Sequence, residues 1–329
     1  MTDLQWARLS NDAFNLALFA YLAAMVGYFA YLAFGRDLIW RVSRTVAFVG
    51  LAGGVVSIVA RGFAANRVPW GNMYEYSVLL ATLVVAGYLL IVEGMFHART
   101  LGGFALMFSV LTMAVAVSFL YVGPGPLVPA LNSYWIKIHV QAAIWGSSLF
   151  ALGGIVTLLY LWQDRRERAQ LTSLRTQEPP PIMGGSLDVD PGVGVGASSG
   201  PEAPADLDPD VDEIAPSGAV AKSSRLPSAQ TLDRVAYRII AFAFPIWTFA
   251  VIAGAIWAQE AWGRYWGWDP KETWSFITWV IFAGYLHARA TSGWKGRRAA
   301  VIAVVGFVSL LITYYAVNLW IVGLHSYAK

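Results

Sequence analysis

Thirteen residues with the sequence WGRYWGWDPKETW, at positions 262–274, concentrate side chains that could bind a flat ligand carrying carboxylates. The stretch holds four tryptophans, Trp262, Trp266, Trp268 and Trp274. Their indole faces can stack on an aromatic molecule, while Arg264 and Lys271 can pair with its carboxylates. Gly263 and Gly267 permit tight turns and a close approach of the backbone. Aromatic belts at membrane interfaces explain scattered tryptophans but not this cluster, so a ligand platform is the better interpretation.

The second half of this stretch predicts the start of a helix. Asp269 fits the N-cap position, Pro270 the first helical position and Glu272 the third, which together make a capping-box pattern. The segment WGRYWGW, at 262–268, then lies in a loop just before the helix. Capping alone accounts for Asp269 and Glu272, whereas the tryptophans need another explanation.

Most of the chain is apolar enough to lie in a membrane. Of its 329 residues, 57% are hydrophobic and 13% are charged, a composition unlike that of a water-soluble domain. A helix needs about 20 apolar residues to cross a bilayer. The sequence predicts an all-α integral membrane protein with about eight transmembrane helices, over 12–34, 45–63, 76–96, 100–121, 138–162, 235–258, 273–290 and 299–323. The segment 273–290 is the least hydrophobic of them, because polar side chains dilute it.

The positive side chains indicate how these spans are oriented. If eight spans alternate, one side of the membrane carries a large group of cations, namely Arg36, Arg41, Arg44, Arg99, Arg165, Arg166, Arg168, Arg289, Lys295, Arg297 and Arg298. The positive-inside rule makes that side the cytoplasm. The tryptophan-rich loop and both termini are then expected on the outer side of the plasma membrane, or of a thylakoid-like equivalent.

One long segment between the spans has a different composition. Residues 164–231 are acidic, rich in proline and poor in hydrophobic residues, which predicts a disordered cytoplasmic linker. This linker would separate a five-span N-terminal bundle, 1–163, from a three-span C-terminal unit, 232–329, that carries the tryptophan-rich loop. Cysteine is absent, so thiolate metal sites are excluded and any thiol chemistry must come from a partner.

Four histidines could ligate a metal. In the predicted topology His139 begins the fifth span and His325 ends the eighth, so both flank the tryptophan-rich loop at one membrane depth. Two imidazoles could there approach a planar ligand from opposite faces. His287 falls in the cytoplasmic half of the seventh span, where a titratable group is a functional candidate, although a hydrogen bond to a neighbouring helix is an open alternative. His97, beside Arg99, is better explained as a solvated interfacial residue.

A ligand with a large flat face, two axial positions for imidazole and two propionates is haem. Zinc or copper bound by the same histidines is the alternative. A copper pathway is disfavoured because cysteine is absent and methionine is sparse, and a zinc site would not require the tryptophans.

At this point the sequence resembles a known family. WGRYWGWDPKETWSF is similar to the tryptophan-rich WWD motif of haem-handling proteins, and the chain from about 12 to 325, apart from the linker, resembles the CcsA or ResC type of cytochrome c assembly protein (System II). The segment PWGNMYEYS, at 69–77, is similar to the family's stretch before the third span, with Asn72, Tyr74 and Glu75 at matching places. A helix cap and interface anchor explains this segment equally well.

The resemblance implies a haem b site. His139 and His325 match external axial ligands of the haem iron, and His287 matches an intramembrane ligand that receives haem from the cytoplasm. The residues that would hold the haem at the WWD surface are Trp262, Gly263, Arg264, Trp266, Gly267, Trp268, Asp269, Pro270, Lys271, Glu272 and Trp274. His97 has no counterpart among the histidines of this family. An alternative in which His97 and His287 of the same chain together ligate haem stays open.

The resemblance also implies partners and an activity. The expected partners are a CcsB or ResB-type membrane protein, apocytochrome c and a thioredoxin-like thiol reductant, with no nucleic acid. The chain would carry haem across the membrane and present it for thioether attachment to apocytochrome c, as the haem-handling subunit of a haem lyase complex. A haem exporter or chaperone with no part in bond formation is the alternative, and a transporter of an unrelated solute is a third hypothesis.

Overall fold

The computed structural model describes residues 1–126, 133–177, 225–321 and 323. Met1–Glu167 and Arg225–Lys329 belong to one compact unit, and Arg168–Ser224 to another. Every regular element of the described residues is helical, which confirms the predicted all-α fold. The division of the spans into a five-span bundle and a three-span unit stays a prediction.

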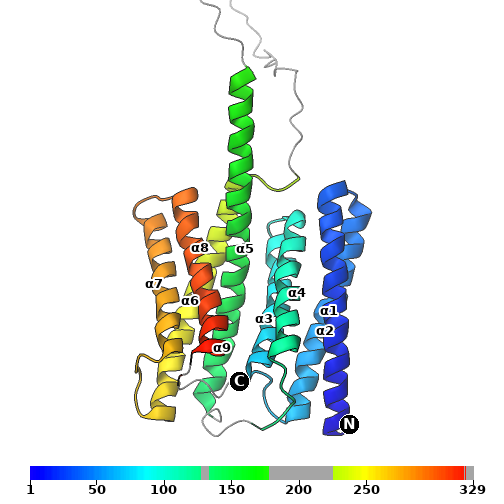
Figure 1. Cartoon of the computed structure of the whole chain (residues 1–329), viewed down its shortest axis with the longest axis vertical. Helices are drawn as coiled ribbons and strands as arrows, with labels where there is room; N and C mark the ends of the chain where they lie inside the picture. Colours follow the sequence, from blue (N-terminus) through cyan, green and yellow to red (C-terminus); the bar gives the residue numbers. More distant parts are fainter. Residues whose placement is uncertain (127–132, 178–224, 322, 324–329) are drawn as a thin grey trace, which may run out of the picture. The chain divides into compact units, whose positions relative to one another are not determined.

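The N-terminal part of the chain forms helices α1 (Asp3–Phe34), α2 (Asp37–Ala65), α3 (Met73–Gly87) and α4 (Gly102–Phe119). α1 and α2 make a hairpin that Figure 1 shows along one edge of the bundle (blue). Gly35 ends α1 in the left-handed region at φ 70°, a conformation that glycine adopts without strain. A π-helix, η1 (Tyr88–Glu93), extends α3, and a 3₁₀ turn, η2 (Arg99–Leu101), leads into α4.

The remaining helices are α5 (Tyr134–Gln177), α6 (Ala229–Trp262), α7 (Pro270–Ala290), α8 (Arg297–Leu311) and the short α9 (Val317–Trp320). A second π-helix, η4 (Ile312–Ala316), connects α8 to α9. α5 and α7 meet through the rings of Phe150 and Phe282, which stack with centroids 3.8 Å apart at an interplanar angle of 5°. Both rings are fully buried, so this contact lies in the hydrophobic core.

Among the described residues, seven helical segments are long and apolar enough to cross a membrane. They correspond to all the predicted spans except 273–290, which supports an integral membrane protein. The exception is still helical, because it forms most of α7. One of its polar side chains faces inward: Thr278 is fully buried, and its Oγ1 lies 2.8 Å from Oγ of Ser309 on α8.

The predicted limits of the acidic linker need correction. Residues 164–177 are helical, because α5 continues without a break to Gln177, and α6 already begins at Ala229. The sequence DRRERAQ at 164–170 is charged but consists mainly of residues with good helix propensity, so it prolongs the helix. The rest of the predicted linker, 178–224, lies outside the described residues.

Candidate functional site

A cavity of about 1160 Å³, part of it open to solvent, lies at one end of the bundle. Its walls come from the start of α3, the start of α5, the end of α6, the α6–α7 loop, the start of α7 and the region from α8 to α9. In Figure 1 the start of α5, the α6–α7 loop and α9 gather at this same, lower end. This volume includes open solvent, so the residues that line the cavity, more than its size, indicate what it could bind.

The cavity collects several of the residues predicted for the site. His139 lines it from α5, Trp262 and Trp266 from the end of α6 and the following loop, and Lys271 and Glu272 from the first turn of α7. These positions are far apart in sequence, and the helix ends bring them together. The stretch at 69–77 adds a further wall with Trp70, Gly71, Asn72, Met73 and Tyr76.

Other predicted residues lie elsewhere. Those that do not line the cavity are Gly263, Arg264, Gly267, Trp268, Asp269, Pro270 and Trp274. Trp268 is 69% exposed and has a positive φ of 58°, so its indole is available at the surface of the loop. His325 lies outside the described residues.

His287 does not join the cavity. It is exposed in the last turn of α7, seventeen residues after Pro270, or about 26 Å along the helix at 1.5 Å per residue. His97 is also exposed and follows η1 with a positive φ of 54°. The structure therefore separates His287 from His139 along the bundle.

His139 is held against α6. Its Nδ1 lies 2.7 Å from the carbonyl oxygen of Ala250, and its ring is parallel to that of Trp257, with an interplanar angle of 7° and centroids 6.4 Å apart. Gly254, between these two residues on α6, also lines the cavity. The imidazole therefore has a fixed orientation beside the cavity.

The predicted helix start at Asp269 is confirmed. The Asp269 carboxylate accepts from the backbone N–H of Lys271, and Pro270 occupies the first helical position. Oε2 of Glu272 accepts from the N–H of Asp269 at 3.1 Å and from that of Gly267 at 2.8 Å. Glu272 thus shapes the tryptophan-rich loop as well as lining the cavity.

Lys271 brings a cation to the cavity wall, in the first turn of α7 and ahead of the span predicted over 273–290. Burial lowers the pKa of its amine to about 8, and the Asp269 carboxylate opposes that shift. A carboxylate placed in the cavity would stabilise the protonated amine further. The site thus offers one end suited to an acidic group and a largely apolar interior.

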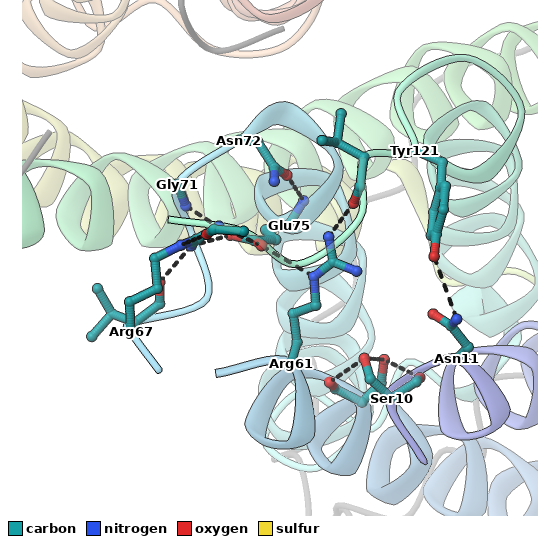
Figure 2. Close-up of polar contacts among 12 residues, drawn as sticks. Ser10, Asn11, Arg61, Arg67, Gly71, Asn72, Glu75 and Tyr121 are labelled. Atoms are coloured by element: carbon teal, nitrogen blue, oxygen red, sulfur yellow. Dashed lines mark hydrogen bonds and ion pairs between the residues drawn. The ribbon is translucent and has the colours of Figure 1, made fainter. Parts of the chain in front are cut away.

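A buried ion cluster supports the wall formed by 70–76, as Figure 2 shows. Glu75 is 3% exposed, and its carboxylate lies 3.1 Å from Nε of Arg61 and 2.8 Å from Nη1 of Arg67. It also accepts from the N–H of Gly71 at 2.8 Å. Asn72 caps α3 by accepting from the N–H of Glu75, so the predicted helix cap in this segment is confirmed.

The same two arginines fix a second loop. The guanidinium of Arg61 donates to the carbonyl of Val122, and Nε of Arg67 donates to that of Gly125 at 2.8 Å. The cluster therefore joins the loop after α4 to the start of α3. Sequence analysis identified Glu75 but missed both arginines, because nothing in the local pattern predicts which cations meet a given carboxylate.

Sequence analysis also missed the polar floor of the cavity. The hydroxyls of Tyr76 on α3 and Ser147 on α5 lie 2.9 Å apart, and the ring of Tyr76 packs at 5.0 Å from that of Tyr314 in η4. Thr313 and Asn318 complete this floor. Each residue is an ordinary member of an apolar span, and a π-helix has no sequence signature that would have identified Tyr314.

Comparison with known proteins identifies the family. A family model described as Cytochrome C assembly protein matches residues 70–325, which is more than half of the chain. The chain belongs to the cytochrome c assembly protein family. The match begins at Trp70 and includes every residue that lines the cavity, the last being Asn318, whereas α1 and α2 lie outside it.

Sequence comparison with individual proteins supports the assignment to the cytochrome c assembly protein family. The cytochrome c biogenesis protein CcsA of Gloeobacter violaceus is 38% identical over 334 residues, covering 95% of this chain and 94% of that protein. CcsA of Porphyra purpurea is 34% identical over 332 residues, covering 97% of each. The resemblance to CcsA-type proteins is therefore confirmed, and haem handling is consistent with this family.

A solved structure has the same fold. Cytochrome c haem lyase CcmF superposes with a TM-score of 0.62 at 16% sequence identity, and the match covers 96% of this chain and 47% of CcmF. The chain thus spans about half the length of CcmF. At 16% sequence identity, the similarity shows a shared fold.

Proposed function

We propose that the cavity binds haem b and that the chain presents this haem to apocytochrome c for thioether attachment. The observation that carries the proposal is the grouping of four side chains around one cavity: His139, Trp262 at the end of α6, Trp266 of the α6–α7 loop, and Lys271. Imidazole can ligate haem iron, indoles can stack on the macrocycle, and the amine of Lys271 can pair with a propionate. His325 is proposed as the second axial ligand.

The chemistry that the site would assist is an addition. Each cysteine thiol of an apocytochrome adds across one haem vinyl group: the S–H bond and the vinyl π bond break, a C–S bond and a C–H bond form, and the addition consumes no oxidant or reductant. The thiols must be reduced beforehand, which is the proposed role of a thioredoxin-like partner, since this chain has no cysteine. The chain's own contribution is to hold the vinyl edge in place, because orientation raises the effective concentration of reactants.

Haem is proposed to reach the cavity from the other side of the membrane. His287, exposed near the far end of α7, is suited to share a haem with a histidine of a CcsB or ResB-type partner. The cations Arg289, near the end of α7, and Arg297, at the start of α8, lie at the helix ends opposite to those that line the cavity. The positive-inside rule then favours a cavity that opens on the outer side.

An assembly assay tests this function. The chain is expressed with a ResB-type partner and a reporter apocytochrome in bacteria that lack their own assembly system, and covalent haem is measured by peroxidase staining. We expect His139→Ala to reduce holocytochrome at least tenfold, since loss of one catalytic-site interaction of about 1.4 kcal/mol already has that effect. His97→Ala is the matched control and should assemble at the wild-type level.

Two outcomes of the assay would contradict the proposal. Wild-type levels of holocytochrome with His139→Ala would exclude this residue from the presentation site. Haem transfer to the outer side without covalent attachment, in the presence of reduced apocytochrome, would instead establish a haem exporter with no part in bond formation.

A further inference from the structure

The hydrogen bond between His139 and Ala250 determines which ring nitrogen carries the proton. Nδ1 of His139 lies 2.7 Å from the carbonyl oxygen of Ala250. A carbonyl oxygen can only accept, so Nδ1 must be the donor. In a neutral imidazole the other nitrogen, Nε2, then carries the lone pair that binds a metal. The backbone of α6 thus selects one tautomer of His139.

The carbonyl of Ala250 belongs to the helix ladder, but it can still accept from His139. A carbonyl oxygen has two lone pairs, so it can receive a side-chain N–H in addition to the backbone N–H one turn ahead. The imidazole must then come very close to the surface of α6. Such an approach needs a position on that face without a side chain.

Gly254 provides this space. A Cβ atom at this position would lie 2.7 Å from both Cε1 and Nδ1 of His139, which is too close for any real contact. Glycine in a helix interior is less favourable than alanine, so the helix loses stability here while the imidazole gains room. Gly254 is four residues after Ala250, and therefore lies on the same face of α6.

Trp257 completes the contact from one turn further along the same face. It is 1% exposed, and its ring is parallel to the imidazole. Its own position is fixed by an edge contact with Trp262, with ring centroids 4.7 Å apart. Ala250, Gly254 and Trp257 together therefore restrict both the rotation and the tautomer of His139.

We propose that this face of α6, formed by Ala250, Gly254 and Trp257, positions His139 so that Nε2 is the atom that ligates haem iron. The inference rests on the proposed haem site and adds to it the groups that orient the ligand. Ala250 acts through its backbone carbonyl, and Gly254 acts by leaving space. Hydrogen bonds of this kind also make the imidazole a better donor to the metal.

Replacing the side chain by free ligands tests the hydrogen bond directly. His139→Gly protein is purified in detergent, loaded with haem b and titrated with 4-methylimidazole or 1-methylimidazole. The two carry the same additional methyl group, but only 4-methylimidazole keeps the N–H that can donate to Ala250. We expect 4-methylimidazole to restore the low-spin absorption spectrum at a concentration about 10- to 100-fold lower than 1-methylimidazole requires. Loss of a hydrogen-bond partner of a metal ligand usually has an effect of this size.

The outcomes separate this inference from the proposed function. If the two ligands restored the low-spin spectrum at equal concentrations, the role of Ala250 would be overturned while His139 would remain a haem ligand. A wild-type haem spectrum for His139→Gly without added ligand would refute both.

A second variant tests the space at Gly254. Gly254→Ala is expected to change the haem spectrum and to weaken haem retention about tenfold, because the methyl group displaces the imidazole. Gly284→Ala on α7 is the matched control, since a Cβ there meets no atom within 4 Å. Wild-type spectra and retention for both variants would contradict the role of Gly254.

Discussion

Replacement of Glu75 by glutamine is expected to lower the free energy of unfolding by about 3–5 kcal/mol, the usual cost of breaking a buried ion pair from one side. The variant keeps the size of the side chain but removes its charge. Arg61 and Arg67 would then be left without their carboxylate, and Arg61 is only 2% exposed. Thermal or denaturant unfolding of the purified protein in detergent measures this loss.

Asp37→Asn is the control for this prediction. Asp37 pairs with Arg99 at 3.9 Å, and both side chains are well exposed, at 67% and 43%. Exposed pairs contribute about 0–1 kcal/mol, so this variant should unfold close to the wild-type midpoint. Equal shifts for the two variants would mean that the Glu75 cluster is not a structural anchor. We also expect Glu75→Gln to lose haem, because the cluster supports the cavity wall at 70–73.

Replacement of Ala143 by tryptophan is expected to block the cavity. Ala143 lines it from α5, one turn after His139 and on the same face of the helix. An indole at this position would occupy space that a ligand of His139 must use. We expect haem binding to weaken by about tenfold or more, equivalent to roughly 1.4 kcal/mol, as measured by the haem retained per purified chain.

The cavity also predicts what this substitution leaves unchanged. Because the new side chain enters open space, the unfolding midpoint should stay near that of the wild type. Ala143→Ser, which adds little volume, should retain haem normally. Full haem retention by Ala143→Trp would show that haem binds elsewhere.

Features encoded by neighbouring residues could be predicted from the sequence. The apolar runs predicted the membrane-spanning helices, and the spacing of Asp269, Pro270 and Glu272 predicted the start of α7. The low hydropathy of 273–290 was also visible, and it has a structural reason, since Thr278 hydrogen-bonds to α8. The predicted linker boundary at 164 was wrong, because the charged residues that follow it have good helix propensity and continue α5.

Features that depend on long-range packing could not be predicted. Arg61 lies fourteen residues from Glu75 and on a different helix, so no local pattern pairs them. The role of Ala250 is carried by its backbone, and an alanine in an apolar span gives no signal. Tyr76 and Ser147 are brought together across 71 positions of sequence. Such contacts follow from how the helices pack against each other.

The absorption spectrum of the purified chain tests whether His139 binds haem iron. The protein is purified without a partner in detergent and loaded with haem b, as wild type, His139→Ala and His97→Ala, so that no haem shared between His287 and a partner contributes to the spectrum. We predict a low-spin bis-histidine haem spectrum for the wild type and His97→Ala, and its loss in His139→Ala. A colourless wild-type protein, or an unchanged spectrum in His139→Ala, would contradict it.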